Sequence, residues 1–378
     1  MKNYKLLTPG PLTTTDTVKR VMMFDHCTWD DDYKQITQEI RKNLLKLAHV
    51  DEKEYTAVLM QGSGSFGVES VLSSVVPEDG AVLLLSNGAY GERAAKMCGY
   101  HKIPCTHVTQ EYNRTPDPGK AEEALKSHPE ITHVMMIHSE TTSGILNDIK
   151  TIGELAHTYG KTFIVDAMSS FAGVDIPMKD WQIDFLISSA NKCIQGVPGF
   201  SFIIADRSLL METKGRARSL CLDLYDQWAG MEKDGKWRYT SPTHVVLAFA
   251  QAMRELEAEG GIPARHARYQ RNMDVLVNNF EELGFKLYVD KTWQGPIIAT
   301  FLYPEGRKFD FQDLYCYIKD RGYAIYPGKL TDADTFRIGV IGEIYEEDIE
   351  KLTEIMREYM AQAKKGGTDD EDCGSQSG

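Results

Sequence analysis

One lysine in the sequence stands where an amine could do covalent chemistry. In the stretch from Ile187 to Phe200, Lys192 follows an apolar run and precedes a turn that contains Gly196 and Gly199. Burial at the end of a strand strips water from an amine and favours its neutral form, which can attack an aldehyde. The small residues around Lys192 would leave room for a flat cofactor. A lysine after a strand is more often a solvated loop residue, so this stretch alone does not establish chemistry.

A second stretch supplies an acid. Residues 162–166 read as a strand that delivers Asp166 to its C-terminal end. Pyridoxal 5'-phosphate needs a lysine that bonds its aldehyde and an acid that keeps its ring nitrogen protonated, so that the ring can withdraw electrons. Asp166 could instead cap a helix or a turn. Lys192 and Asp166 together favour the cofactor site.

A glycine-rich stretch supplies a place for a phosphate. Ser63, Gly64 and Ser65 open a predicted helix directly after a strand or turn at 56–60. Backbone N–H groups at a helix start bind phosphate, and small residues let the anion approach closely. The stretch is neither a Walker A loop nor a dinucleotide fingerprint, and by itself it could be a tight turn. With Lys192 and Asp166 it completes the three parts that pyridoxal 5'-phosphate requires.

Composition sets the broad class of protein. The 378 residues are 42% hydrophobic, and the formal net charge of −13 argues against a general nucleic-acid or anionic-membrane surface. Seven scattered cysteines show no C-x-x-C pair and no metal-ligand spacing, which indicates a reduced chain without a metal site. The N-terminus lacks an apolar stretch of signal-peptide length, and no segment approaches a membrane span. We therefore expect a cytoplasmic protein.

Short apolar strands alternate with helices between residues 55 and 205. This alternation predicts an α/β fold with a mostly parallel sheet flanked by helices, whose ligands bind at the C-terminal strand ends. The predicted strands are 81–86, 103–108, 132–137, 162–166, 183–188 and 200–205, and the predicted helices include 33–48, 91–99, 119–127 and 150–159. Asp166 and Lys192 fall at or just past such ends.

The remaining chain predicts a second, smaller α+β unit. Two long helices at 243–259 and 262–283 precede strands near 296–303, 323–326 and 335–339 and helices at 310–320 and 346–362. The expected domains are an extended segment 1–20, a large cofactor-binding domain 21–260, a small domain 261–363 and a disordered tail 364–378. Part of the extended segment could pack on the small domain.

Motifs along nearly the whole chain resemble the class V aminotransferases, of the pyridoxal-phosphate fold type I. They are Leu7-Thr-Pro-Gly-Pro, Gly62-Ser-Gly-Ser, Asn87-Gly-Ala-Tyr-Gly-Glu-Arg, Glu140-Thr-Thr-Ser-Gly, Val165-Asp-Ala and Ser189-Ala-Asn-Lys. Within that class the chain most resembles the members that act on 2-aminoethylphosphonate and pyruvate. The motifs for this are Phe24-Asp-His-Cys-Thr-Trp-Asp, Tyr239-Thr-Ser-Pro-Thr-His-Val-Val and Phe336-Arg-Ile-Gly-Val-Ile-Gly.

The resemblance implies a role for each site residue. Lys192 would bond the cofactor and Asp166 would pair with its ring nitrogen. The other implied contacts are Tyr90 stacked on the ring, Thr141 beside the ring, Ser63, Gly64 and Ser65 around the phosphate, and Thr240 on the phosphate of the neighbouring subunit. The last contact implies a homodimer with shared active sites. Asn191 stands where many relatives have glutamine, and its shorter reach leaves its phosphate contact open.

Arg337 is the candidate for recognition of the substrate acid. It lies in an apolar strand of the small domain, and its planar fork of donors suits a carboxylate or a phosphonate. A structural ion pair is the alternative. The resemblance implies transamination of 2-aminoethylphosphonate with pyruvate, which yields phosphonoacetaldehyde and L-alanine. An alanine or serine:glyoxylate aminotransferase, a lyase acting on a hydroxylated aminophosphonate, and a cofactor-free binding protein are the alternatives.

Overall fold

The computed structural model describes residues 4–305, 309–328, 330 and 333–366. The strands are β1 (Lys5–Leu6), β2 (Tyr55–Gln61), β3 (Ala81–Ser86), β4 (Cys105–Thr109), β5 (Ile131–Ile137), β6 (Ser139–Glu140), β7 (Ile145–Leu146), β8 (Thr162–Asp166), β9 (Phe185–Ser189), β10 (Phe200–Asp206), β11 (Ile298–Leu302), β12 (Tyr323–Ala324), β13 (Tyr326–Pro327) and β14 (Thr335–Gly339). The helices are α1 (Asp16–Arg20), α2 (Asp31–Leu47), α3 (Gly64–Val75), α4 (Ala89–Tyr100), α5 (Pro118–Ser127), α6 (Ile149–Thr158), α7 (Arg207–Glu212), α8 (Leu224–Asp234), α9 (Thr243–Glu259), α10 (Gly261–Glu282), α11 (Phe311–Asp320) and α12 (Glu346–Gly366).

A seven-stranded sheet forms the centre of the larger part of the molecule. Its strand order is β2-β10-β9-β8-β5-β3-β4, and every neighbouring pair is parallel except the two that involve β10. The parallel strands β3, β5, β8 and β9 therefore end at one edge, where helices or loops begin. The predicted α/β fold with a mostly parallel sheet is confirmed.

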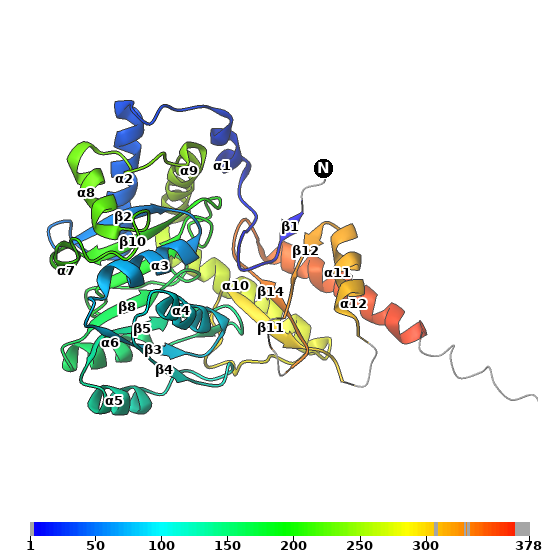
Figure 1. Ribbon diagram of the computed structural model, residues 1–378. Coiled ribbons are helices and arrows are strands. Elements are labelled where there is room, and N and C mark those ends of the chain that lie inside the picture. The colour runs from blue at the N-terminus through cyan, green and yellow to red at the C-terminus, as the bar shows by residue number, and fades with distance from the viewer. Residues whose placement is uncertain (1–3, 306–308, 329, 331–332, 367–378) are drawn as a thin grey trace, which may run out of the picture.

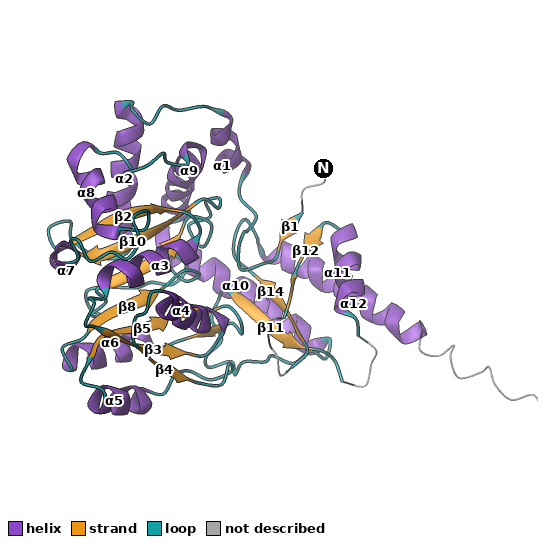
Figure 2. Ribbon diagram, viewed as in Figure 1, coloured by secondary structure: helices purple, strands orange, loops and turns teal. Residues whose placement is uncertain are grey.

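Helices cover both faces of this sheet (Figure 2). Helices α2, α5, α6 and α9 pack on one face, and α3, α4, α7 and α8 pack on the other. Strand β3 is buried on both of these faces. Leu83 and Leu85 pack in the core under α2, α5, α6 and α9, while Val82 and Leu84 pack in the core under α3, α4, α7 and α8. A strand buried on both faces needs an apolar side chain at every position, which hides the alternation of a half-exposed strand.

A smaller unit follows in the chain. Strands β11, β14 and β13 form an antiparallel sheet, and α10, α11 and α12 pack around the associated apolar core. Helix α12 continues to Gly366, so the predicted tail from residue 364 begins within this helix, and its residues 367–378 lie outside the described residues.

The N-terminal segment links the two units. Figure 1 shows it running from α1, beside the large unit, to β1, which lies beside β12 of the small unit. The pairing is parallel, with Lys5 opposite Tyr323 and Leu6 opposite Ala324. The described part of the segment predicted as extended over residues 1–20 contains a turn at Thr8–Pro11, and helix α1 begins right after Thr15. There, the Thr15 hydroxyl accepts a hydrogen bond from the N–H of Val18 and starts α1, as Ser and Thr commonly do at helix N-termini.

Two glycines separate the long helices α9 and α10. Gly260 (φ +111°) ends α9, and Gly261 (φ +74°) begins α10. Both backbone angles lie in a region that glycine adopts readily and that other residues avoid. The chain therefore turns sharply between α9 and α10 without a loop. In the part of the chain that the structure describes, none of the helices combines the length and apolar character needed to cross a membrane.

Candidate active site

A cavity of about 220 Å³ lies at the C-terminal ends of the parallel strands. Seven residues predicted from the sequence line it: Ser63, Gly64, Ser65, Tyr90, Asp166, Asn191 and Lys192. They come from the start of α3, from α4, from the end of β8 and from the turn after β9. The structure therefore brings most of the predicted cofactor residues to one place.

Lys192 lies in the turn after β9, and its amine meets the N-terminal segment. Its Nζ donates a hydrogen bond to the carbonyl of Pro9 at 2.8 Å. Gly10 leaves room for this contact, because a Cβ at that position would lie 2.7 Å from Nζ. Its φ of +125° also favours glycine. The turn Thr8–Pro11 thus lies across one side of the lysine.

Asp166 is buried at the end of β8, where its carboxylate would be stabilised by a cationic partner. Its Oδ1 accepts a hydrogen bond from the N–H of Met168 at 2.9 Å. Burial, with a contribution from the negative charge of Glu140, raises the pKa of Asp166 to about 6, although Met168 and Lys192 act in the opposite direction. A cation placed against this carboxylate would reverse the shift, as a protonated ring nitrogen would.

The turn between β2 and α3 forms the cradle predicted for a phosphate. Gly62 (φ +104°) lets the chain turn sharply into α3, and Ser63 precedes the first helical residue without making a side-chain capping bond. A Cβ on Gly64 would overlap the end of the Met168 side chain, so a larger residue there would have to displace Met168. The first amides of α3 therefore border the cavity, where the partial positive charge of the helix favours an anion.

One cationic side chain at this cavity was missed from the sequence. Arg93 on α4 lines the cavity and donates a hydrogen bond to Ser65 Oγ at 3.1 Å. Its guanidinium lies over the ring of Tyr90, 5.1 Å from the ring centre. Its spacing from Tyr90 indicates this position, because residues three apart in a helix share a face and Tyr90 is a predicted cofactor residue.

A buried carboxylate holds the start of α4 against the β6–β7 hairpin. Glu140 is fully buried, and its Oε1 accepts hydrogen bonds from the Thr142 backbone at 3.0 Å and hydroxyl at 2.6 Å. The Thr142 hydroxyl in turn accepts from the N–H of Ala89 at 3.1 Å. Burial raises the pKa of Glu140 above its ordinary value. This network fixes the helix that carries Tyr90 and Arg93.

Arg337 lies outside the cavity lining but reaches toward the same hairpin. It is 2% exposed on β14, and its Nη1 donates to the carbonyl of Thr141 at 2.8 Å, while Nε donates to Pro327 at 2.9 Å. Among the described residues, the ion pairs include none with Arg337. Its present partners are neutral carbonyls, so the guanidinium keeps a charge that an acid could neutralise. The side chain of Thr141 does not line the cavity.

Thr240 lies at an exposed position outside this cavity. Its carbonyl accepts a hydrogen bond from the side chain of Gln61, one residue before the glycine that opens the cradle. Its predicted contact with a neighbouring subunit's phosphate stays a prediction.

Comparison with known proteins identifies the family. The profile of the aminotransferase class-V family matches residues 25–352. The chain belongs to the class V aminotransferases. It is 57% identical over 360 residues to the 2-aminoethylphosphonate–pyruvate transaminase of Lysinibacillus sphaericus (strain C3-41), an alignment that covers 95% of this chain and 98% of that protein.

A second relative in sequence and a solved structure are also similar to this class V aminotransferase. It is 50% identical over 359 residues to the bifunctional phosphonoacetaldehyde hydrolase/aminoethylphosphonate transaminase of Clostridioides difficile (strain 630), with 95% of this chain and 56% of that protein covered. Among solved structures, the pyridoxamine-pyruvate aminotransferase of Mesorhizobium loti superposes with a TM-score of 0.88 at 22% identity, covering 96% of this chain and 93% of that chain. The structural likeness confirms the fold.

Proposed function

We propose that this class V aminotransferase moves the amino group of 2-aminoethylphosphonate to pyruvate, producing phosphonoacetaldehyde and L-alanine. The observation that carries the proposal is the 57% identity to the protein named 2-aminoethylphosphonate–pyruvate transaminase, in an alignment that covers 98% of that protein. The arrangement of Lys192, Asp166 and the α3 cradle around one cavity fits the chemistry.

Pyridoxal 5'-phosphate is the proposed cofactor, because the cavity offers a separate partner for each of its ends. When bound, it supplies an aldehyde that accepts amines and a ring that withdraws electrons. Lys192 would bond the aldehyde, Asp166 would pair with the ring nitrogen and Tyr90 would stack on the ring. Ser63, Gly64, Ser65 and Arg93 would hold the phosphate, with Thr240 from the neighbouring subunit. Thr141 would contact the ring, and Asn191, which lines the cavity, would lie beside the cofactor.

Lys192 is also the proposed proton carrier. With the cofactor and a substrate amine bound, the Nζ of Lys192 would act as the base for the substrate carbon that bears the amine. The same nitrogen would carry the proton from that carbon. The Pro9 carbonyl, 2.8 Å away, accepts a hydrogen bond that orients the amine.

Arg337 is the proposed anchor for the acid group of both substrates. A guanidinium binds a phosphonate or a carboxylate through paired, charge-assisted hydrogen bonds. An incoming acid would compete with the neutral carbonyls of Thr141 and Pro327, which Arg337 contacts in the structure. One arginine can therefore serve two acids that occupy the site in turn.

The absorption spectrum of the purified protein tests this function. A bound cofactor absorbs near about 410–420 nm, and 2-aminoethylphosphonate added without a keto acid should convert that band to one near about 330 nm. Pyruvate should then restore the first band and yield L-alanine. A band that ignores the phosphonate but responds to serine or alanine would favour the glyoxylate-type activity instead, and a protein without any such band would contradict the cofactor.

A further inference from the structure

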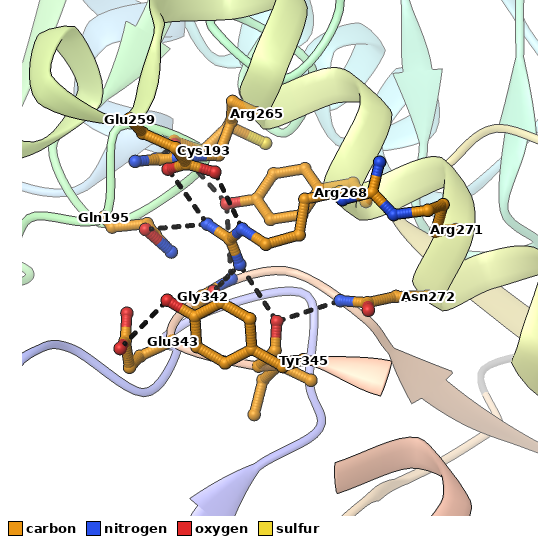
Figure 3. Close-up of polar contacts among 12 residues, drawn as sticks. Cys193, Gln195, Glu259, Arg265, Arg268, Arg271, Asn272, Gly342, Glu343 and Tyr345 are labelled. Atoms are coloured by element: carbon orange, nitrogen blue, oxygen red, sulfur yellow. Dashed lines mark hydrogen bonds and ion pairs between the residues drawn. The ribbon is translucent and has the colours of Figure 1, made fainter. Parts of the chain in front are cut away.

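A buried group of charged residues lies between the two units of the molecule. We name it the junction cluster. Figure 3 shows Glu259, Arg265, Arg268 and Asn272, and Tyr269, whose ring centre lies 5.0 Å from the Arg268 guanidinium, also belongs to it. Glu259 ends α9, and the other four residues lie along α10. None of these residues lines the cavity that holds Lys192.

One side of the junction cluster holds the turn that follows Lys192. Arg265 Nη1 donates to the carbonyl of Cys193 at 2.6 Å, and Arg268 Nη2 lies 3.4 Å from Gln195 Oε1. Gln195 has a φ of +70°, which is uncommon for a residue other than glycine. The cluster therefore fixes the turn that begins at the lysine itself.

The other side of the junction cluster holds the chain that follows β14. Arg268 Nη1 donates to the carbonyls of Gly342 at 2.7 Å and Ile344 at 2.9 Å. Asn272 Nδ2 donates to Ile344 at 2.9 Å, and to Val340 at 3.2 Å. Strand β14 carries Arg337, so these contacts fix the strand that presents the proposed substrate arginine.

The charged groups of the junction cluster are buried or partly buried, which is energetically unfavourable. Arg265 is 1% exposed, and Glu259 pairs with Arg265 Nε at 2.6 Å and with Arg268 Nε at 2.8 Å. Partial burial opposes the charged form of Glu259, but the two guanidinium groups outweigh it and lower its pKa. Burying such charges is costly, and apolar residues often stabilise a core as well or better. Stability alone is a weak reason for this choice of residues.

We propose that the junction cluster sets the separation between Lys192 and Arg337, and thereby the length of amino donor that the enzyme accepts. The inference rests on the proposed function. Arg268 alone contacts Gln195 on the lysine side and Gly342 on the arginine side, so one rigid guanidinium spans the two strand ends. Its fixed geometry makes Arg268 a positioning residue, although it touches no substrate.

The test compares donors that differ by one methylene. The ratio of kcat/KM for 2-aminoethylphosphonate to that for 3-aminopropylphosphonate should fall about tenfold in Arg268→Met, because a loosened site no longer discriminates by length. Arg268→Lys, which keeps a donor near Gly342, should recover part of the ratio. Arg271→Met removes a charge from the same helix, where Arg271 is exposed and pairs with Glu346 at 3.1 Å, and should leave the ratio unchanged.

Hydrogen exchange gives a second readout that needs no turnover. Peptides covering 190–197 and 340–345 should both exchange faster in Arg268→Met, and in Glu259→Gln if the first variant does not fold. Faster exchange in only one peptide, or a parallel loss of activity with both donors at a constant ratio, would overturn the inference. A wild-type enzyme that turns over neither aminophosphonate would instead refute the proposed function, and the exchange result would still decide whether the cluster couples the two segments.

Discussion

Asp166 shows how one buried residue sets the chemistry of the cavity. Its carboxyl is 6% exposed, and its pKa is raised to about 6 by burial and by Glu140. Such a group accepts a cationic partner readily, because the partner replaces the lost water. Two measurable consequences follow from this, one for catalysis and one for stability.

Replacement of Asp166 by Asn should remove the charge while keeping the shape. We expect the half-reaction with 2-aminoethylphosphonate to slow by about a hundredfold or more, because a neutral amide cannot stabilise a protonated ring nitrogen. Single-turnover absorbance of the cofactor-loaded enzyme measures this rate. A variant that reacts at the wild-type rate would show that Asp166 does not serve the ring.

The raised pKa of Asp166 also predicts a pH effect on the cofactor-free protein. Between the ordinary value of 3.8 and about 6, the folded carboxyl keeps a proton that the unfolded chain has lost. Stability therefore falls as pH rises through that window, by up to about 3 kcal/mol for this group. Urea unfolding from pH 4 to 7 should show this loss in the wild type and not in Asp166→Asn. Equal pH profiles for the two proteins would contradict the assignment.

Arg93 should contribute to cofactor affinity. It is the cation that donates to Ser65 in the cradle, so Arg93→Ala should raise the cofactor Kd about tenfold through loss of a charge-assisted bond. Fluorescence titration of the cofactor-free protein measures the Kd. Lys96→Ala, an exposed position on the same helix, is the matched control. An unchanged Kd in Arg93→Ala would place the phosphate elsewhere.

At the scale of elements, the strands that carry the site were the most predictable. The predicted ranges 81–86, 162–166 and 335–339 agree with β3, β8 and β14 at both ends. Continuous apolar runs bounded by polar or turn residues mark such strands clearly. Asp166 and Lys192 could therefore be placed at one edge of a sheet from the sequence.

Other elements depended on contacts that a sequence does not display. Helix α1 is short and follows a proline-bearing stretch, so its capping threonine gave a weak signal. The junction cluster joins Arg268 to Gln195 and Gly342, which are distant in the chain. No local pattern predicts such partners, because residue spacing within a helix says which residues share a face but not what that face meets.

The turn at Gly10 offers a test at this scale. A Cβ in Gly10→Ala would lie 2.7 Å from Lys192 Nζ, at a strained φ of +125°, so the lysine should be displaced and the cofactor absorption band weakened. Gly215→Ala also places alanine at a positive φ (+76°), but no atom lies within 4 Å of the new Cβ, and its band should be unchanged. Equal spectra for both variants would show that the lysine tolerates the displacement.

At the scale of the whole molecule, the proposed homodimer would complete each site with a residue of the other subunit. Thr240 is exposed and lies outside the cavity of its own chain. The segment that contains Phe24 and Trp29 is far away in the sequence but contacts this region, since Asp25 lies 3.2 Å from His244. Phe24 is 62% and Trp29 70% exposed. Exposed apolar groups of this size are typical of protein interfaces.

Mixed dimers test the sharing of sites. Lys192→Ala and Thr240→Asp should each be nearly inactive alone, the second because a carboxylate would repel the phosphate. Co-expressed chains should regain about one quarter of wild-type activity, since half of randomly assorted dimers hold one intact site of two. Activity that stays absent in the mixture would mean that Thr240 serves the site of its own chain, and an active Thr240→Asp variant would mean that it serves neither site.

The pairing of β1 with β12 also constrains the order in which the protein can be made. Lys5 leaves the ribosome long before its partner Tyr323, which lies in a much later part of the sequence. Domains generally form from the N-terminus during synthesis, so the large sheet can fold while β1 is still unpaired. The Pro9 carbonyl beside Lys192 belongs to the N-terminal segment that β1 begins. The lysine side of the active site can therefore take its final form only after β12 has been synthesised.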